Sequence, residues 1–315
     1  MSNQIPKAAI DLYDAYTHGA IDRRDFIDRL TRIAGGAAAA TALLPVLAND
    51  YARAAVIAED DDRLVITTSK FNVETVDLIA PEEIIADGAP NGGVVPTTHL
   101  PYVTAYHARL KNHSVAPAII VIHENRGLNP HIKDVARRIA LEGFHAFAVD
   151  MLSPYGGTPE DEDKAREMIG KLDADKTAAK LAEIALSLAL LKTHQRMVGA
   201  IGFCWGGGMV NKLAAASDAL VAGVSYYGRQ ASSDEAAKIK AKLMLHYAGE
   251  DERINAGIND YEAALKAAGV DYRLFMYDGA QHAFNNDTNE ARYDKTAADL
   301  AWGRSMAFFK DALKF

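Results

Sequence analysis

The chain has 315 residues, of which 49% are hydrophobic and 24% charged, so its apolar content supports a folded core and excludes disorder as the main state. Its 34 basic and 42 acidic residues give a net charge of −8, which argues against a nucleic-acid partner. The single cysteine, Cys204, excludes an intrachain disulfide and any multi-cysteine metal site. That cysteine is either a packing residue or a nucleophile, and the residues around it in the sequence distinguish the two roles.

Residues 1–55 differ in composition from the rest of the chain. Arg23 and Arg24 precede an apolar run at 33–48, and small residues follow at 52–55. This order is typical of an export signal, and the arginine pair with Phe26 resembles the twin-arginine type. The apolar run is shorter than the roughly 20 residues of a membrane-spanning helix, so no stable span is expected. The pattern predicts an exported or periplasmic protein.

A second interpretation of residues 1–55 is an amphipathic helix that docks on the rest of the protein. Phe26, Ile27, Leu30 and Ile33 would share one face of such a helix. Asp28 supports this alternative, because it stands where the export pattern usually has a lysine. A cytoplasmic location goes with this interpretation.

From residue 60 onward, strand-like runs alternate with helical patterns. We expect strands at 64–68, 73–79, 104–110, 118–123, 145–150, 197–202, 220–226, 243–248 and 272–277, and helices at 132–142, 177–193, 205–215, 255–268 and 289–314. The proline-rich and glycine-rich segment 80–101 is predicted to be a loop. The alternation predicts an α/β fold with a mostly parallel central sheet and helices on both faces, in one domain from 60 to 315.

The sequence Gly202-Phe203-Cys204-Trp205-Gly206 stands between an expected strand and an expected helix. This is the nucleophile-elbow pattern of the α/β-hydrolase fold, in which glycines two residues before and after the nucleophile permit a tight turn. The elbow places the Cys204 sulfur at a helix N-terminus, where the helix dipole favours the reactive thiolate. We therefore predict that Cys204 is the nucleophile.

A thiol nucleophile needs a histidine, and that histidine needs an acid. Only two histidines follow Cys204, and His246 lies inside an expected strand, whereas His282 lies in a loop after the last strand. We predict that His282 is the base. The segment Gly249-Glu250-Asp251-Glu252 offers three carboxylates, of which Asp251 is preferred because of the Gly-x-Asp turn and its place before the helix expected from about Asn255.

The segment His123-Glu124-Asn125-Arg126-Gly127 follows the first central strand. In this fold that loop supplies one backbone N–H of the oxyanion hole and the residue after the nucleophile supplies the other, here Asn125 and Trp205. Glu124 would then lie beside Cys204 and could accept its proton. The alternative is that Glu124 only shapes the loop through a salt bridge to Arg126.

Residues 100–315 resemble the dienelactone hydrolases, or carboxymethylenebutenolidases. The resemblance rests on the Glu124 loop with Gly127-Leu128-Asn129, and on Asp150-Met151-Leu152, Gly202-Phe203-Cys204-Trp205-Gly206-Gly207, Tyr226-Tyr227-Gly228, Gly249-Glu250-Asp251 and Gly279-Ala280-Gln281-His282-Ala283-Phe284. It implies a Cys204–His282–Asp251 triad, a Glu124 that helps deprotonate Cys204 when substrate binds, and hydrolysis of a cyclic enol ester. No cofactor is expected, because no nucleotide motif appears and the histidines show no paired ligand spacing beyond His123 and His131.

The sequence departs from this family at the arginines that hold the substrate carboxylate. The corresponding regions read Leu152-Ser153-Pro154-Tyr155 and Phe284-Asn285-Asn286-Asp287. Arg126 or Arg229 could replace the missing arginines. Without such a replacement, a pocket near Trp205, Tyr155 and Phe284 would favour a neutral ester.

Two further interpretations follow from these departures. The chain could be a general carboxylesterase or thioesterase that acts on a different acyl group, or a silent ligand-binding homologue that kept the fold. The intact set of Cys204, Asp251 and His282 argues against a silent protein. The sequence does not indicate an oligomeric state.

Overall fold

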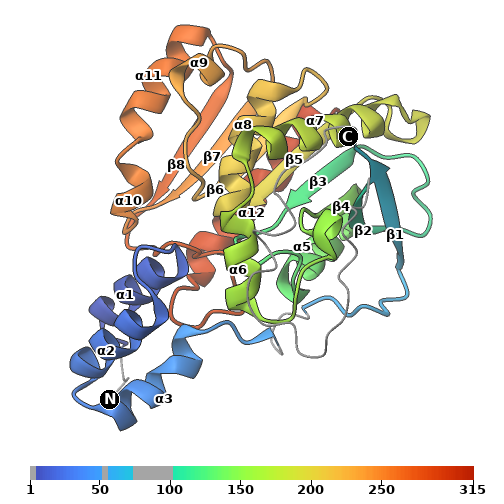
Figure 1. Cartoon of the computed structure of the whole chain (residues 1–315). Helices are drawn as coiled ribbons and strands as arrows, with labels where there is room; N and C mark the ends of the chain where they lie inside the picture. Colours follow the sequence, from blue (N-terminus) through green and yellow to red (C-terminus); the bar gives the residue numbers. More distant parts are fainter. Residues whose placement is uncertain (1–4, 52–55, 74–101) are drawn as a thin grey trace.

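The structure is a computed structural model that describes residues 5–51, 56–73 and 102–315. Among these residues, eight strands form one sheet in the order β1-β2-β4-β3-β5-β6-β7-β8 (Figure 1). The strands are β1 Leu64–Asn72, β2 Tyr102–Leu110, β3 Ala118–Ile122, β4 His145–Asp150, β5 Val198–Phe203, β6 Ala222–Tyr226, β7 Lys242–Ala248 and β8 Tyr272–Tyr277. The pairs β1–β2 and β2–β4 are antiparallel, and the strands from β4 to β8 pair in parallel.

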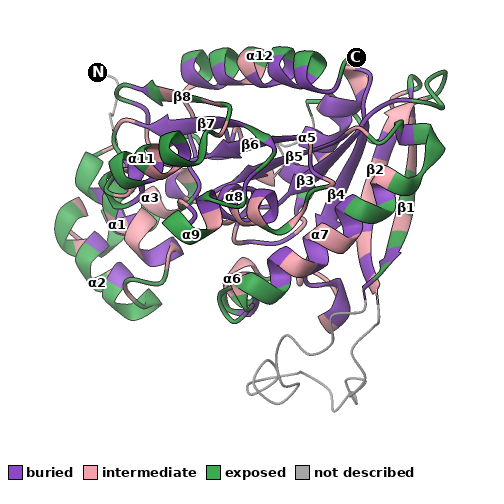
Figure 2. Ribbon diagram, turned by 90° about the horizontal axis from the view of Figure 1, so that it is seen from above, coloured by how far each residue is buried: buried purple, intermediate pink, exposed green. Residues whose placement is uncertain are grey.

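Helices cover both faces of the sheet, as the sequence predicts. The described helices of this part are α5 Pro130–Leu141, α6 Glu162–Gly170, α7 Ala174–Leu190, α8 Trp205–Ala216, α9 Ser233–Ala236, α10 Glu252–Asn255, α11 Ile258–Ala268 and α12 Lys295–Ala312, with short 3-10 turns at Ser153–Tyr155 and Lys192–His194. Figure 2 shows the buried strands between α12 on one side and α7 on the other. This is an α/β-hydrolase fold.

Strand β3 shows why the sheet forms in the interior. All five of its residues are buried, and its side chains alternate between the two faces. Ile120 and Ile122 pack in the cluster with α7 and α8, whereas Ile119 and Val121 pack in the cluster with α5 and α12. Each face therefore has its own hydrophobic core, and the loops after the parallel strands meet at one edge of the sheet.

Several element boundaries differ from the sequence-based expectations. The expected helix 255–268 begins only at Ile258, as α11, and a separate short helix, α10, precedes it. The expected helix 289–314 begins only at Lys295, after its cap Asp294. Helices α6 and α9 were not expected. Both are short and polar, so their helical period is weak, and side-chain caps from Asp161 and Ser232 fix their starts.

Residues 7–47 contain three helices that project from the hydrolase part (Figure 1). They are α1 Lys7–Thr17, α2 Arg23–Ala34 and α3 Ala37–Leu47, and they share a small core that includes Tyr13, Phe26 and Leu30. Phe26 and Leu30 are buried in α2, as expected for a docked helix, but Ile33 is largely exposed. Helix α1 was not expected from the sequence.

No single helix in the described part of the chain is long and apolar enough to cross a bilayer. Helices α2 and α3 taken together have sufficient length and apolar composition, but the chain bends by 112° between them. The small residues at 52–55 lie outside the described residues, as do residues 74–79 of an expected strand and the expected loop 80–101.

Candidate functional site

Cys204 lies at the turn between β5 and α8, and its backbone is strained. Its φ of 54° and ψ of −114° place it in a conformation that side chains rarely adopt. A Cβ on Gly202 would lie 2.1 Å from the Gly206 carbonyl oxygen, and one on Gly206 would lie 2.3 Å from the carbonyl oxygen of Ile122. The two glycines are therefore required for the turn that presents the Cys204 side chain at the edge of the sheet.

Asp251 and His282 meet at the same edge. Asp251 caps α10 by accepting a hydrogen bond from the Ile254 amide at 3.2 Å, and its second oxygen, Oδ2, accepts a hydrogen bond from His282 Nδ1. His282 lies in the connection between β8 and α12, and both side chains are buried. The structure thus brings Asp251, His282 and Cys204 together, with a His282 ring nitrogen within 4.8 Å of the Cys204 sulfur.

A second histidine, His18, also contacts the cysteine. It lies at the C-terminal end of α1, and its Nε2 is 3.2 Å from Cys204 Sγ. Its Nδ1 is 2.8 Å from the carbonyl oxygen of Asp14 and 3.2 Å from Asp14 Oδ1. The rings of His18 and His282 meet edge to face, 4.7 Å apart. Neither His18 nor Asp14 was predicted from the sequence, because no motif connects a histidine in an N-terminal extension with a nucleophile 186 positions later.

These charges change the acidity of the nucleophile. Burial alone would raise the pKa of the Cys204 thiol, but the positive charges of His18 and His282 outweigh burial and lower the pKa from 9.0 to about 6. For His282 the effects have the opposite sign: burial would lower the pKa of the imidazole, but the Asp251 carboxylate and the Cys204 thiolate raise it well above 6.5. Near neutral pH the electrostatics therefore favour a thiolate beside protonated imidazole.

Glu124 is buried, and its Oε2 accepts a hydrogen bond from Asn286 Nδ2 at 2.9 Å. It does not pair with Arg126 in this structure. Arg126 instead donates from Nε to Glu162 at 2.7 Å and from Nη2 to the Tyr13 hydroxyl at 3.1 Å. The sequence could not reveal these partners, because α1 and α6 are brought to the Glu124 loop only by the tertiary fold.

The two residues of the predicted oxyanion hole lie in their expected elements. Trp205 is the first residue of α8, directly after Cys204, and its ring stacks on His123 with centroids 5.2 Å apart. Asn125 lies in the loop after β3, and its side chain donates a hydrogen bond to the Thr17 carbonyl oxygen of α1 at 2.7 Å. The loop is thereby attached to the N-terminal helix.

The predicted pocket residues have different environments. Phe284 is completely buried against Tyr226, Tyr227 and Tyr277, so it is part of the core behind the site. Tyr155 is half-buried against the cluster that contains α7 and α8, and Arg229 is exposed. His246 is buried between Tyr277 and Ser305, in agreement with a core role.

Arg292 is a buried cation that the sequence analysis did not select. It lies between His282 and α12, with Nη1 3.6 Å from Asp14 Oδ1 and its guanidinium 5.3 Å from the centre of the Tyr13 ring. Arg292 follows His282 by ten positions, whereas the family's arginine would lie in the segment Phe284-Asn285-Asn286-Asp287. In this structure its charge faces residues of α1.

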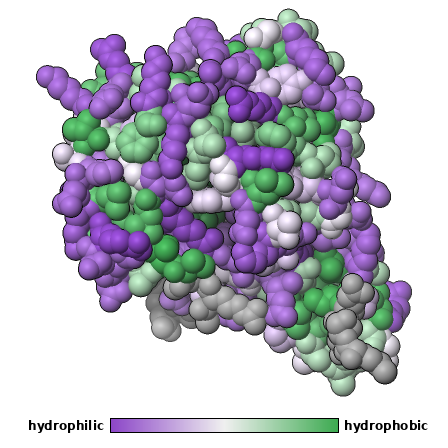
Figure 3. All heavy atoms as spheres, turned by 180° about the vertical axis from the view of Figure 1, so that it is seen from behind, coloured by the Kyte–Doolittle hydropathy of each residue, from purple (hydrophilic) through white to green (hydrophobic). Residues whose placement is uncertain are grey.

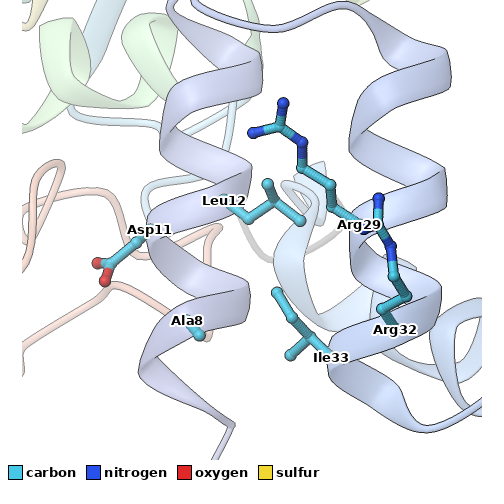
Figure 4. A pocket seen from close by; sticks show the side chains of 6 residues that line it. All are labelled: Ala8, Asp11, Leu12, Arg29, Arg32 and Ile33. Atoms are coloured by element: carbon cyan, nitrogen blue, oxygen red, sulfur yellow. The ribbon is translucent and has the colours of Figure 1, made fainter.

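A concave surface lies between α1 and α2. Figure 4 shows Leu12 and Ile33 between the two helices, with Arg29 and Arg32 on α2; Ala8 and Asp11 complete its lining. This surface contains no nucleophile and no histidine. The groups that can do chemistry are therefore gathered at the edge of the sheet.

The chain was compared with known proteins. The model of the Dienelactone hydrolase family matches residues 103–313. The chain belongs to this family. A relative from Saccharolobus solfataricus is 34% identical over 236 residues, which cover 62% of this chain and 90% of the relative. One from Methylorubrum extorquens is 30% identical over 269 residues, which cover 79% of this chain and 92% of the relative. Both carry the name carboxymethylenebutenolidase as a provisional assignment.

A solved structure from Klebsiella pneumoniae, provisionally titled a dienelactone hydrolase, matches with a TM-score of 0.60 and 26% identity, and covers 78% of this chain and 98% of that one. A second family model, described as YqhI-like, matches residues 1–35, which contain α1, α2 and His18. Because the members of this family are hydrolases of small molecules, the chain is an enzyme that acts on small molecules.

Proposed function

We propose that this member of the dienelactone hydrolase family hydrolyses ester or lactone bonds with Cys204 as nucleophile, His282 as acid and base, and Asp251 as the group that orients His282. The observation that carries the proposal is the strained elbow, which holds the Cys204 thiol beside a histidine already hydrogen-bonded to a buried carboxylate. The alternative acids Glu250 and Glu252 lie outside this contact, since Glu250 binds Lys7.

In the proposed reaction the Cys204 thiolate forms a bond to the acyl carbon, and the proton of the His282 imidazolium passes to the departing alkoxide oxygen. Water then attacks the thioester, His282 takes a proton from that water, and the carboxylic acid leaves as the thiolate is regenerated. Asp251 remains ionised throughout and holds the imidazole in the correct tautomer. A low thiol pKa supports the first step, because the thiolate is the nucleophilic form.

The developing oxyanion would be bound by the backbone N–H groups of Asn125 and Trp205. The start of α8 supports this role, because amides at the first turn of a helix have no partner inside the helix. Removal of one such donor in other enzymes costs about 2.7–4 kcal/mol of barrier. The bond from Asn125 to Thr17 makes the position of this loop depend on α1.

Glu124 is proposed to accept the Cys204 proton when substrate binds in the molecules that still hold the neutral thiol. In this structure its carboxylate is held by Asn286, so it would have to leave that amide before it could act on the thiol. Substrate binding in the Glu124 loop could supply this displacement. This role rests on the family resemblance.

For the substrate, a specific observation favours a second candidate, a neutral or weakly polar ester. Arg126 is bound to Glu162 through Nε and to the Tyr13 hydroxyl through Nη2, so a substrate carboxylate would have to compete with the Glu162 carboxylate for this cation. Burial of a carboxylate without a cation costs several kcal/mol. Arg292 is the cation that could reverse this preference, because it is buried beside the site and faces Asp14.

The experiment that tests the function is a screen of neutral and anionic esters with intact-mass analysis during turnover. We expect an acyl adduct on Cys204 and loss of turnover in Cys204→Ala. Substrate preference is measured with a neutral p-nitrophenyl ester and dienelactone in Arg126→Ala and Arg292→Ala. An adduct on a serine, or unchanged turnover in Cys204→Ala, would contradict the proposal. No turnover of any ester would favour a ligand-binding homologue.

We further propose that residues 1–55 direct export. The supporting features are the exposed side chain of Arg23, the exposed Arg24 and the mostly exposed apolar helix α3 (Figure 3, lower right). The alternative is a cytoplasmic protein in which α1 and α2 remain docked.

A further inference from the structure

The contact between His18 and Cys204 creates a cluster of three metal-binding side chains. A ring nitrogen of His18, the sulfur of Cys204 and a ring nitrogen of His282 all lie within 4.8 Å of one another. The distance between His18 Nε2 and Cys204 Sγ is 3.2 Å. Two ligands on one zinc ion, at bond lengths of about 2.0–2.3 Å, lie roughly 3.5 Å apart, so a small adjustment would place all three around one ion.

Both histidines are already oriented for this role. His282 Nδ1 donates to Asp251, and His18 Nδ1 lies against the carbonyl and carboxylate oxygens of Asp14. Each histidine therefore presents Nε2 to the sulfur. His282 Nε2 is buried and has no hydrogen-bond partner in the structure. A histidine that binds an oxygen through one nitrogen and offers the other is the usual arrangement around protein-bound zinc.

We propose that the full-length chain binds one divalent transition-metal ion of the zinc type through Cys204 Sγ, His18 Nε2 and His282 Nε2, with water as a fourth ligand. One thiolate and two imidazoles suit zinc, cobalt or nickel and not magnesium or calcium, which prefer oxygen ligands. Near neutral pH, binding releases the acidic protons of the two imidazolium groups into solvent, because Cys204 is already a thiolate. The ion covers the nucleophile, so it inhibits hydrolysis and holds α1 on the site.

The test uses Co²⁺ added to metal-free full-length protein. Because Cys204 is the only cysteine, a near-ultraviolet band for charge transfer from thiolate to cobalt must come from this site. We expect one ion per chain, at least tenfold weaker binding in His18→Ala, and a smaller loss in Asp14→Asn, which keeps the ligand and loosens its orientation. His113→Ala, at an exposed histidine outside the site, should bind as the wild type does.

The measurement does not depend on hydrolysis, so failure of the proposed function leaves it interpretable. Circular dichroism of each variant shows whether α1 to α3 stay folded, and Asp14→Asn provides a second comparison if His18→Ala unfolds that segment. Absence of the charge-transfer band at stoichiometric Co²⁺ would overturn the proposal. So would equal affinity in the wild type and a folded His18→Ala protein, because the ion would then bind without α1.

Discussion

Helices α1 and α3 belong to the same N-terminal segment but relate to the hydrolase domain in opposite ways. Helix α1 is joined to it by polar contacts: Lys7 binds Glu250, Tyr13 binds Arg126, Tyr16 binds Asp163 and Arg166, and His18 contacts Cys204. Helix α3 is composed of alanine, leucine, threonine, valine and proline, and most of its residues are exposed or half-buried. One helix is adapted to the active site, whereas the other keeps the composition of an export signal.

Neither sequence-based interpretation of residues 1–55 included α1: the predicted docked helix corresponds to α2, and the predicted export signal covers α2 and α3. His18 precedes Arg23, so removal of an export signal at 52–55 would also remove the contact with Cys204. The form with α1 docked and the exported form without it would then differ in the pKa of the Cys204 thiol. The predictions below separate the contribution of the hydrolase domain from that of α1.

The largest effect is expected within the hydrolase domain. Asp251→Asn should lower kcat about 10³–10⁴-fold, because the amide cannot hold His282 in the correct tautomer. Glu250→Gln is the matched control and should leave kcat nearly unchanged, since the Glu250 side chain is partly exposed and binds Lys7. Steady-state kinetics with one ester suffice. A loss below about threefold in Asp251→Asn would identify Glu250 or Glu252 as the acid.

If residues 1–55 direct export, as we propose, export should depend on the twin arginines Arg23 and Arg24. Replacement of both Arg23 and Arg24 by lysine should retain most of the chain in the cytoplasm, with the fold intact because both side chains are exposed. The same change at Arg29 and Arg32, on the same helix, is the control and should not block export. Cell fractionation and N-terminal sequencing give the result. An uncut N-terminus in protein from the native host would favour the docked helix instead.

The contribution of α1 to the nucleophile can be measured without a substrate. With a pKa of about 6, Cys204 is mostly thiolate at pH 7, so its alkylation by iodoacetamide in the presence of a chelator should be half-maximal near pH 6. Burial raises this pKa and the charge of His18 lowers it, so His18→Ala should move the profile to higher pH and slow alkylation at pH 7. His113→Ala should not move it. An unchanged profile in His18→Ala would show that His282 alone controls the thiol.

The smallest effect concerns the attachment of α1. Tyr16→Phe removes the hydrogen bond to Asp163, 2.6 Å long, and should lower stability by about 1 kcal/mol. Hydrogen exchange of the α1 amides should become faster. Tyr272→Phe removes a similar bond to Glu262 within the hydrolase domain and should leave exchange in α1 unchanged. Equal exchange in both variants would mean that Tyr16 does not hold α1 in place.

The sequence by itself was sufficient to predict the α/β fold and the positions of Cys204, Asp251 and His282. These features are local: a continuously apolar strand, a glycine pair around a nucleophile, and polar residues just after successive strands each leave a signal in a few neighbouring positions. Parallel strands then bring such loops to one edge of the sheet without further information. Helix boundaries after residue 250 were less predictable, because short polar caps rather than hydrophobic period decide them.

Only the tertiary structure decided which residues surround the nucleophile. His18 reaches Cys204 from 186 positions away and is held there by Asp14, Arg126 pairs with Glu162 rather than Glu124, and Arg292 faces α1. The contacts of His18 and Arg292 depend on how α1 docks, and docking is determined by the sum of many weak polar and aromatic contacts between distant segments. Such contacts leave no periodic pattern and no fixed spacing in the sequence, so they can be identified only in the folded structure, where the distant segments lie side by side.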